Sequence, residues 1–205
     1  MRGRFITLEG GEGSGKSTQA RRIADWLRAR GRIVVLTREP GGTPLAEAIR
    51  TLALQRWDEG MTPTTELLLM FAARSAHVHA LIEPHLAAGH DVVCDRFVDS
   101  SYAYQGAGKG VDVRHLAALE ALVLPKLKPD LTFVLDLPVE QGLRRAHARG
   151  QNNRFEDEAR PFFERVREAF LARAADEPQR CVVIDARADA DTVFDAIVAV
   201  LEQRL

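Results

Sequence analysis

The sequence predicts an α/β protein built on a five-stranded parallel sheet with helices on both faces. Five short apolar runs are rich in β-branched residues and hardly alternate with polar ones, as expected of strands covered on both sides. Segments with helical periodicity separate these runs, and strands that alternate with helices form parallel sheets through right-handed crossovers. The length of 205 residues fits one domain spanning residues 1–205, although length alone also allows two.

The predicted strands cover residues 5–8, 33–36, 92–94, 131–137 and 182–184. The predicted helices, identified by apolar residues three or four apart, cover residues 17–30, 45–52, 65–88, 112–127, 158–175 and 191–205, with another beginning at Pro138. Gly31 and Gly89 stop the first and third helices, and Pro84 is expected to kink the third.

Composition excludes several classes of function. The formal net charge of −1 gives no broad basic surface for nucleic acid or for a membrane. No apolar run approaches the ~18 residues of a membrane span, and the N-terminus lacks the apolar core of a signal peptide. Cys94 and Cys181 show no metal-binding spacing, so they are interpreted as small buried apolar residues. We therefore expect a cytoplasmic protein without nucleic-acid or membrane partners.

Glycine and charged residues follow the predicted strands at the points where the strands end. Residues 10–17 follow the first strand, residues 38–42 the second, and Asp95 and Arg96 the third, while an arginine-rich segment comes after the fourth strand and its helix. Ligands of open parallel sheets bind beyond the carboxyl ends of the strands. The sequence thus predicts one site built from several strand ends.

Residues 10–17, GGEGSGKS, match the phosphate-binding pattern G-x-x-x-x-G-K-[ST] between a predicted strand and a predicted helix, which indicates a three-layer P-loop fold. The glycines let backbone N–H groups turn toward a phosphate, and the helix N-terminus adds partial positive charge. Lys16 is expected to reach the β- and γ-phosphates of ATP, and the Ser17 hydroxyl to hold Mg²⁺. The predicted ATP-binding residues are Gly10, Gly11, Glu12, Gly13, Ser14, Gly15, Lys16, Ser17 and Thr18.

Glu12 is an unusual residue for such a loop, because a carboxylate beside ATP phosphates is repelled unless it has a positive or hydroxyl partner. We expect it to face a second substrate or to act through Mg²⁺. The N-K-x-D motif of GTPases and the L-S-G-G-Q motif of transport ATPases are absent from the sequence. The short chain therefore favours a small kinase, which needs a second phosphate pocket and a cover that excludes water.

Several segments together resemble the bacterial thymidylate kinases, from about Phe5 to Asp185. The segments are residues 10–17, Thr-Arg-Glu-Pro-Gly-Gly-Thr at 37–43, Phe-Ala-Ala-Arg at 71–74, Asp-Arg-Phe at 95–97, Tyr-Gln-Gly at 104–106, and Arg-Gly at 149–150 with Arg-Phe-Glu at 154–156. The resemblance implies transfer of the ATP γ-phosphate to dTMP, giving dTDP for dTTP biosynthesis. It also implies Mg²⁺ as cofactor and a homodimer.

The resemblance assigns the acceptor phosphate to two arginines. Arg96, at a strand end, can present its planar guanidinium bidentately, and Arg50 lies on the second helix. Asp95 is expected to hold Mg²⁺ through water or to orient Arg96. Glu39 is expected to meet the sugar or an arginine.

For the thymine base, the resemblance implies an aromatic side chain that stacks and an arginine that reaches a carbonyl. Phe71 and Arg74 share a helix face, although many relatives place the aromatic residue four positions before the arginine, where this chain has Met70. Either Met70 or Phe71 packs on the base. The predicted contacts to base and sugar also include Ser101, Tyr104 and Gln105.

The polar segment at about residues 147–160 is interpreted as a lid. The phosphate loop carries no arginine, so positive charge for the transition state must come from elsewhere, and the resemblance implies Arg149 or Arg154. The predicted catalytic residues are Lys16, Arg96, Arg149, Arg154 and Glu12. The acceptor phosphate is already anionic, so positioning and neutralisation of charge can carry the reaction without a general base. The alternatives are another P-loop nucleoside or nucleotide kinase and a nucleotide-binding regulator without turnover.

Overall fold

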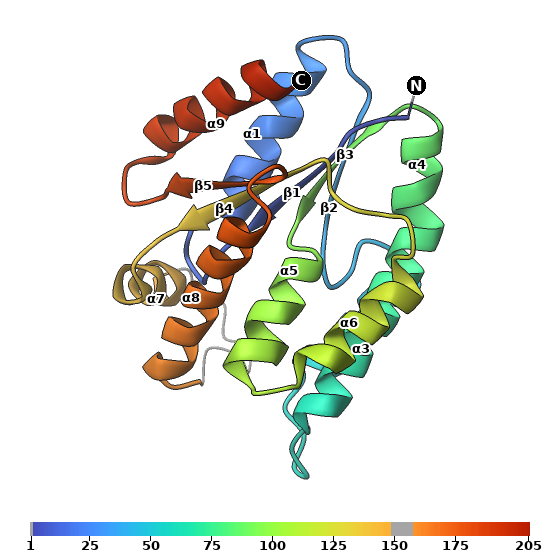
Figure 1. Ribbon diagram of the computed structural model, residues 1–205, viewed down its shortest axis with the longest axis vertical. Coiled ribbons are helices and arrows are strands. Elements are labelled where there is room, and N and C mark those ends of the chain that lie inside the picture. The colour runs from blue at the N-terminus through green and yellow to red at the C-terminus, as the bar shows by residue number, and fades with distance from the viewer. Residues whose placement is uncertain (1, 149–157) are drawn as a thin grey trace.

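The computed structural model describes residues 2–148 and 158–205, and the described residues form a five-stranded parallel sheet with helices on both faces (Figure 1). The strands are β1 (Phe5–Glu9), β2 (Val34–Arg38), β3 (Asp91–Asp95), β4 (Leu131–Asp136) and β5 (Cys181–Asp185). Their order across the sheet is β2-β3-β1-β4-β5. The predicted α/β class is confirmed. Most predicted strands stopped one or two residues short, because the apolar runs exclude the polar residues at their ends, such as Glu9 and Asp91.

The helices are α1 (Lys16–Arg28), α2 (Pro44–Leu54), α3 (Pro63–His77), α4 (Glu83–Ala87), α5 (Val98–Ser101), α6 (Val113–Val123), α7 (Val139–His147), α8 (Arg160–Asp176) and α9 (Ala190–Arg204). Two π-helical segments, η1 (Val78–Ile82) and η2 (Tyr102–Gly108), continue α3 and α5. Within the residues described, none of the helices combines the length and the apolar character that crossing a membrane requires.

Alternation along the strands divides the core between the two faces of the sheet. Ile6 and Leu8 of β1 pack with apolar residues of α1 and α9, which lie side by side in Figure 1. Phe5 packs on the other face with residues of α3, α4 and α6. A third cluster joins α8 to Val134 of β4 and to Tyr104 of η2. Every residue of β1 is buried, so the loop that follows it starts from a rigid base.

The strand order reverses between β1 and β3. The chain leaves β1 for β2, which lies beyond β3, whereas β4 lies on the opposite side of β1. The register pairs Leu8 of β1 with Asp95 of β3, so the loops after these two strands begin side by side. Such a reversal is where open α/β sheets form a ligand-binding crevice.

Two predicted helices differ from the structure in ways that proline explains. The helix predicted over residues 65–88 begins at Pro63 and widens into the π-helical segment η1 before Pro84, rather than showing a simple kink. Proline has no N–H to donate and its ring crowds the carbonyl four residues earlier, which a wider turn relieves. The helix predicted to reach residue 127 ends at Val123, because Leu124 precedes a proline and leaves the helical region (φ −124°, ψ 49°).

The helical segment formed by α5 and η2 was not predicted. Serines and glycines in residues 98–108 are weak helix formers. The segment is supported from outside itself, because the Glu9 carboxylate of β1 accepts hydrogen bonds from the backbone N–H groups of Phe97 and Ser100 at 2.7 and 3.2 Å. Its far end packs so closely on α8 that a Cβ at Gly108 would lie 2.5 Å from the ring of Phe162.

Candidate functional site

A cavity of about 460 Å³ opens at the carboxyl edge of the sheet. Its lining residues are Glu12, Gly13, Ser14, Gly15, Lys16, Ser17, Arg38, Glu39, Pro40, Arg50, Leu54, Met70, Arg74, Asp95, Arg96, Phe97, Ser100, Ser101, Tyr104, Gln105 and Ala146. Five of these side chains are basic and three are acidic, so the cavity attracts anions although the whole chain carries a formal charge of −1.

Most of the predicted site residues line this cavity. Four lie elsewhere among the described residues: Gly10, Gly11 and Thr18 are outside its lining, and Phe71 is buried in the core. Arg149 and Arg154, and most of the predicted lid, lie outside the described residues. Sequence reasoning missed six lining residues: Arg38, Pro40, Leu54, Phe97, Ser100 and Ala146. Arg38 had a signal in the sequence, because it ends a strand at the predicted ligand edge.

The phosphate loop follows β1 and opens α1. Gly10, Gly13 and Gly15 have φ of 134°, 68° and 92°, values that an L-residue with a side chain rarely adopts. Gly13 is also closely packed, because a Cβ there would lie 2.1 Å from the carbonyl oxygen of Gly142 in α7. The loop therefore needs glycine at position 13 for both conformation and space.

Lys16 folds back over its own loop. Its Nζ donates to the carbonyl oxygens of Gly10 and Gly11, at 3.0 and 2.7 Å, and to Ser14 Oγ at 3.2 Å. Burial, followed by repulsion from Arg96, lowers the pKa of Lys16 to about 8. Two features therefore disfavour the charge on this ammonium, and the negative charge of a bound phosphate would offset both.

Ser17 and Asp95 meet beside the loop. The Ser17 hydroxyl donates to Asp95 Oδ2 across the β1–β3 boundary. Asp95 Oδ1 is buried and has no hydrogen-bond partner among the described residues. A hydroxyl and a carboxylate with a buried unpaired oxygen form a pair of hard oxygen ligands, which suits Mg²⁺.

Glu12 lies against Arg96 and Tyr104. Its Oε1 accepts from Arg96 Nη2 at 3.0 Å and from the Tyr104 hydroxyl at 2.8 Å. Arg96 Nη2 also donates to the Tyr104 oxygen at 3.0 Å. Arg96 and Tyr104 are thus the positive and hydroxyl partners that a carboxylate in a phosphate loop was expected to need. Burial and the neighbouring Glu12 keep Tyr104 protonated by raising its pKa.

Arg96 adopts a backbone conformation that is unfavourable for arginine, with φ of 71°. Left-handed residues other than glycine cost about 1–3 kcal/mol and cluster at functional sites. Arg96 Nη1 donates to the carbonyl oxygen of Gly10 at 3.2 Å and to Ser100 Oγ at 3.3 Å. The arginine thus spans the phosphate loop and α5, and its side chain is only 17% exposed.

Glu39 and Arg74 form a buried ion pair at the opposite side of the cavity. Arg74 Nε donates to Glu39 Oε2 at 2.7 Å, and Arg74 also donates to Ser101 Oγ and to the Phe97 carbonyl oxygen, both at 3.0 Å. His77, which is fully buried, contacts Glu39 Oε1 at 3.0 Å. Among the alternatives for Glu39, the structure brings it to an arginine.

Met70 lines the cavity, whereas Phe71 does not. Phe71 lies beneath the Arg74 guanidinium, 4.8 Å from its carbon to the ring centre, and is 2% exposed. Gln105 Nε2 donates to Glu66 Oε1 at 2.7 Å, and Lys109 pairs with the same buried carboxylate at 2.9 Å. This hydrogen bond fixes the orientation of the Gln105 amide.

Arg50 and Arg38 complete the basic lining. Arg50 Nη1 donates to the carbonyl oxygen of Pro40 at 2.7 Å. Burial, followed by repulsion from Arg38, lowers the pKa of Arg50, although a guanidinium remains charged. Arg38 pairs with Glu47 at 2.9 Å and is half exposed. An anion between these arginines would reduce their mutual repulsion.

Comparison with known proteins gives concordant findings. The thymidylate kinase family model matches residues 8–197. A thymidylate kinase of Pseudomonas fluorescens is 61% identical over 186 residues, covering 91% of this chain and 89% of that protein. One from Chromohalobacter salexigens is 57% identical over 205 residues, covering 99% and 97%. The crystal structure of thymidylate kinase from Ehrlichia chaffeensis matches with a TM-score of 0.79 at 35% identity, covering 98% of this chain and 99% of that one.

Replacing Gly13 by alanine is expected to weaken nucleotide binding at least about tenfold, because the added Cβ would overlap the Gly142 carbonyl and move the phosphate loop. Gly60→Ala is the matched control, since Gly60 has a similar φ of 76° with open space around its Cβ position. The control carries only the backbone cost of about 1–2 kcal/mol. Titration with a fluorescent nucleotide measures the difference; equal affinities for the two variants would contradict close packing of the loop.

Glu9 is expected to make stability fall as the pH rises toward neutrality. Burial and then the charge of Asp99 raise the pKa of Glu9 from 4.5 to about 7, so between these values the folded protein holds a proton that the unfolded chain has released. Its contribution is present below pH 4.5 and is lost through pH 7, about 3 kcal/mol in all. Denaturant unfolding at several pH values should show this slope in the native chain relative to Glu9→Gln. Parallel profiles would disprove it.

Proposed function

The chain belongs to the thymidylate kinase family, and we propose that it transfers the γ-phosphate of ATP to dTMP in the cavity at the carboxyl edge of the sheet. The observation that carries this proposal is the convergence of two phosphate-binding devices. The phosphate loop with Lys16 and the guanidinium of Arg96 line one cavity from neighbouring strand ends. A donor phosphate on the loop and an acceptor phosphate on the arginine would meet between them.

ATP binds with its phosphates on the loop. The backbone N–H groups of residues 10–15 and the N-terminus of α1 face the phosphates, while Lys16 exchanges its carbonyl contacts for phosphate oxygens. Thr18 and the glycines outside the cavity lining remain proposed ATP contacts, because backbone donors of a P-loop act together.

Mg²⁺ is the proposed cofactor. Ser17 and Asp95 fit it, as their hard oxygens lie together and Asp95 Oδ1 has no other partner among the described residues. Two protein ligands suffice, since Mg²⁺ in kinases is held by few carboxylates together with waters and substrate phosphates. When bound, the ion would neutralise charge on the transferring phosphate.

The acceptor phosphate lies on Arg96, with Arg50 beside it. Arg96 presents a planar set of donors whose carboxylate partner, Glu12, comes from the phosphate loop. Glu12 thereby couples the donor loop to the acceptor arginine. Arg50, whose lowered pKa reflects burial and cationic neighbours, supplies a second guanidinium for which an anion is the natural partner.

The base and sugar occupy the far end of the cavity. Arg74 is held rigidly by Glu39, Ser101 and Phe97, so that it can donate to a thymine carbonyl. Gln105 reads the base edge with its amide. Met70 supplies the apolar contact to the base, with Phe71 supporting Arg74 from below. Tyr104 lies on the sugar side, where it would crowd a 2′-hydroxyl and favour deoxyribose.

The transition-state charge is neutralised by Lys16, Arg96 and a lid arginine, Arg149 or Arg154. The phosphate loop carries Glu12 and no arginine, so a further cation must approach from another segment. The acceptor oxygen is anionic at neutral pH and attacks without a general base. Catalysis then consists of holding two phosphates in line and excluding water.

The proposed assembly is a homodimer in the cytoplasm, where ATP and dTMP are available. Exposed leucines on neighbouring helices offer an interface: Leu45 and Leu52 of α2, Leu68 of α3 and Leu122 of α6, which are 45–75% exposed. Burying such side chains between two copies would remove apolar surface from water. A single domain with its lid over residues 147–160 is proposed for each subunit.

With ATP and Mg²⁺ supplied, ADP formation should require dTMP and exceed that seen with UMP or AMP in a coupled assay across an acceptor panel. Lys16→Ala should abolish transfer, because the loop loses its phosphate cation. A preference for UMP or AMP would indicate another nucleotide kinase. ATP binding with no phosphorylated acceptor would indicate a regulator.

Arg96→Ala should raise KM for dTMP about 100-fold while the Kd for ATP changes less than about threefold, because two charge-assisted hydrogen bonds to the acceptor phosphate are lost. Arg114→Ala, which alters an exposed arginine outside the cavity, is the control. Steady-state kinetics and ATP titration separate the two substrates. Equal losses for dTMP and ATP would refute the acceptor role.

A further inference from the structure

Glu9 is a buried carboxylate that lines no part of the cavity, yet it accepts hydrogen bonds from two residues that do, Phe97 and Ser100. It ends β1, immediately before the phosphate loop, and is 0% exposed. Its Oε1 accepts from the backbone N–H groups of Phe97 and Ser100, and its Oε2 accepts from Ser100 Oγ at 2.6 Å. All three donors belong to the turn that follows Arg96.

Ser100 connects this carboxylate to Arg96. Its hydroxyl donates to Glu9 Oε2 and accepts from Arg96 Nη1 at 3.3 Å. A serine hydroxyl has one proton, so both bonds can form only if Oε2 acts as an acceptor. When Glu9 is ionised, above its pKa of about 7, the hydrogen bonds therefore run in one direction, from Arg96 through Ser100 to Glu9.

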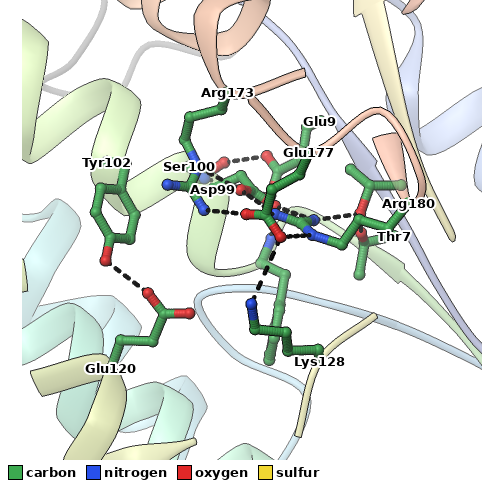
Figure 2. Close-up of polar contacts among 12 residues, drawn as sticks. Thr7, Glu9, Asp99, Ser100, Tyr102, Glu120, Lys128, Arg173, Glu177 and Arg180 are labelled. Atoms are coloured by element: carbon green, nitrogen blue, oxygen red, sulfur yellow. Dashed lines mark hydrogen bonds and ion pairs between the residues drawn. The ribbon is translucent and has the colours of Figure 1, made fainter. Parts of the chain in front are cut away.

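The neighbouring carboxylate, Asp99, has different partners. Asp99 accepts from the two terminal nitrogens of Arg180, Nη1 and Nη2, each at 2.8 Å, and from Arg173 of α8, as Figure 2 shows. In the same view a dashed line joins Glu9 to Ser100. Besides Asp99, the charged group that acts on Glu9 is Arg96, which opposes the rise of its pKa. Asp99 thus binds Arg173 and Arg180, whereas Glu9 is linked through Ser100 to Arg96.

We propose that Glu9 is a positioning residue that holds Arg96 on the acceptor phosphate through Ser100. This inference rests on the proposed function, in which Arg96 binds the phosphate of dTMP. Arg96 needs such support because its φ of 71° is unfavourable and two of its other contacts, Gly10 and Glu12, lie in the loop that must bind ATP, while the third is the Tyr104 hydroxyl of η2. Ser100 anchors the guanidinium to a part of the fold that ATP does not touch.

Glu9→Gln tests the direction of the hydrogen bonds with little change of shape. The two backbone N–H groups require an acceptor, so the amide oxygen takes the place of Oε1 and the amide NH₂ faces Ser100. Ser100 must then accept from this NH₂ group, in competition with Arg96. We expect KM for dTMP to rise about tenfold, while KM for ATP changes less than about twofold.

Ser100→Ala removes the link and leaves Glu9 and the backbone contacts in place. It is expected to raise KM for dTMP by the same factor. The double variant should be no worse than Ser100→Ala alone, because both changes interrupt one path. Losses that multiply in the double variant would overturn the proposal, and so would a normal KM for dTMP in Ser100→Ala. The serine variant also keeps the test decisive if Glu9→Gln folds poorly.

Asp91→Asn is the matched control for disturbing a buried carboxylate. Asp91 is 1% exposed, accepts from Arg4 N at 2.8 Å and pairs with Arg32 at the other end of β3. It should lower thermal stability without changing KM for dTMP; a rise equal to that of Glu9→Gln would reduce Glu9 to a purely structural role. Arg96→Ala distinguishes a failure of the proposed function from a failure of the positioning role. If it leaves KM for dTMP unchanged, the proposed function fails, whereas a large rise there with none in Ser100→Ala refutes only the positioning role.

Discussion

The pairing of β1 with β3 is the constraint on which the rest of the site depends. Their parallel register places Leu8 opposite Asp95, so the phosphate loop and the Asp95-Arg96 turn emerge next to each other. From this one adjacency follow the Ser17–Asp95 bond, the Arg96–Gly10 bond and the Glu12–Arg96 ion pair. No single loop could build the site, because each of these contacts joins residues about 80 positions apart in the chain.

Charge in the cavity is arranged so that the cations are ordered before any anion arrives. Arg74 is held by Glu39, and Arg96 by Glu12, so neither guanidinium is free to turn in solvent. Their carboxylate partners also limit the repulsion among five basic side chains. A ligand that binds such groups loses little side-chain freedom, which favours affinity and alignment alike.

Sequence patterns predicted the sheet, its approximate strands and the carboxyl-edge site, because buried parallel strands and a P-loop leave strong local signals. They did not predict the α5–η2 helix, whose first turn is capped by Glu9, about 90 residues away. The choice between Met70 and Phe71 was equally inaccessible, since adjacent residues on one helix differ by only about 100° and packing decides which one lines a cavity. In the sequence Glu9 is merely the polar end of an apolar run, and only the fold reveals what it binds.

Two carboxylates, Glu9 and Glu12, orient Arg96 from different parts of the fold. Glu12 lies in the loop that binds ATP, so its hold on Arg96 must respond when phosphates arrive. Glu9 lies one residue before that loop on a fully buried strand, and acts on the same arginine from the other side, through Ser100. If Arg96 were bonded only to the phosphate loop, it would shift whenever ATP binds or leaves. Because it is also bonded through Ser100 to Glu9 of the sheet, it keeps its position. The strained backbone at Arg96 is tolerated for the same reason, because strand pairing on one side and the capped α5 on the other determine its conformation.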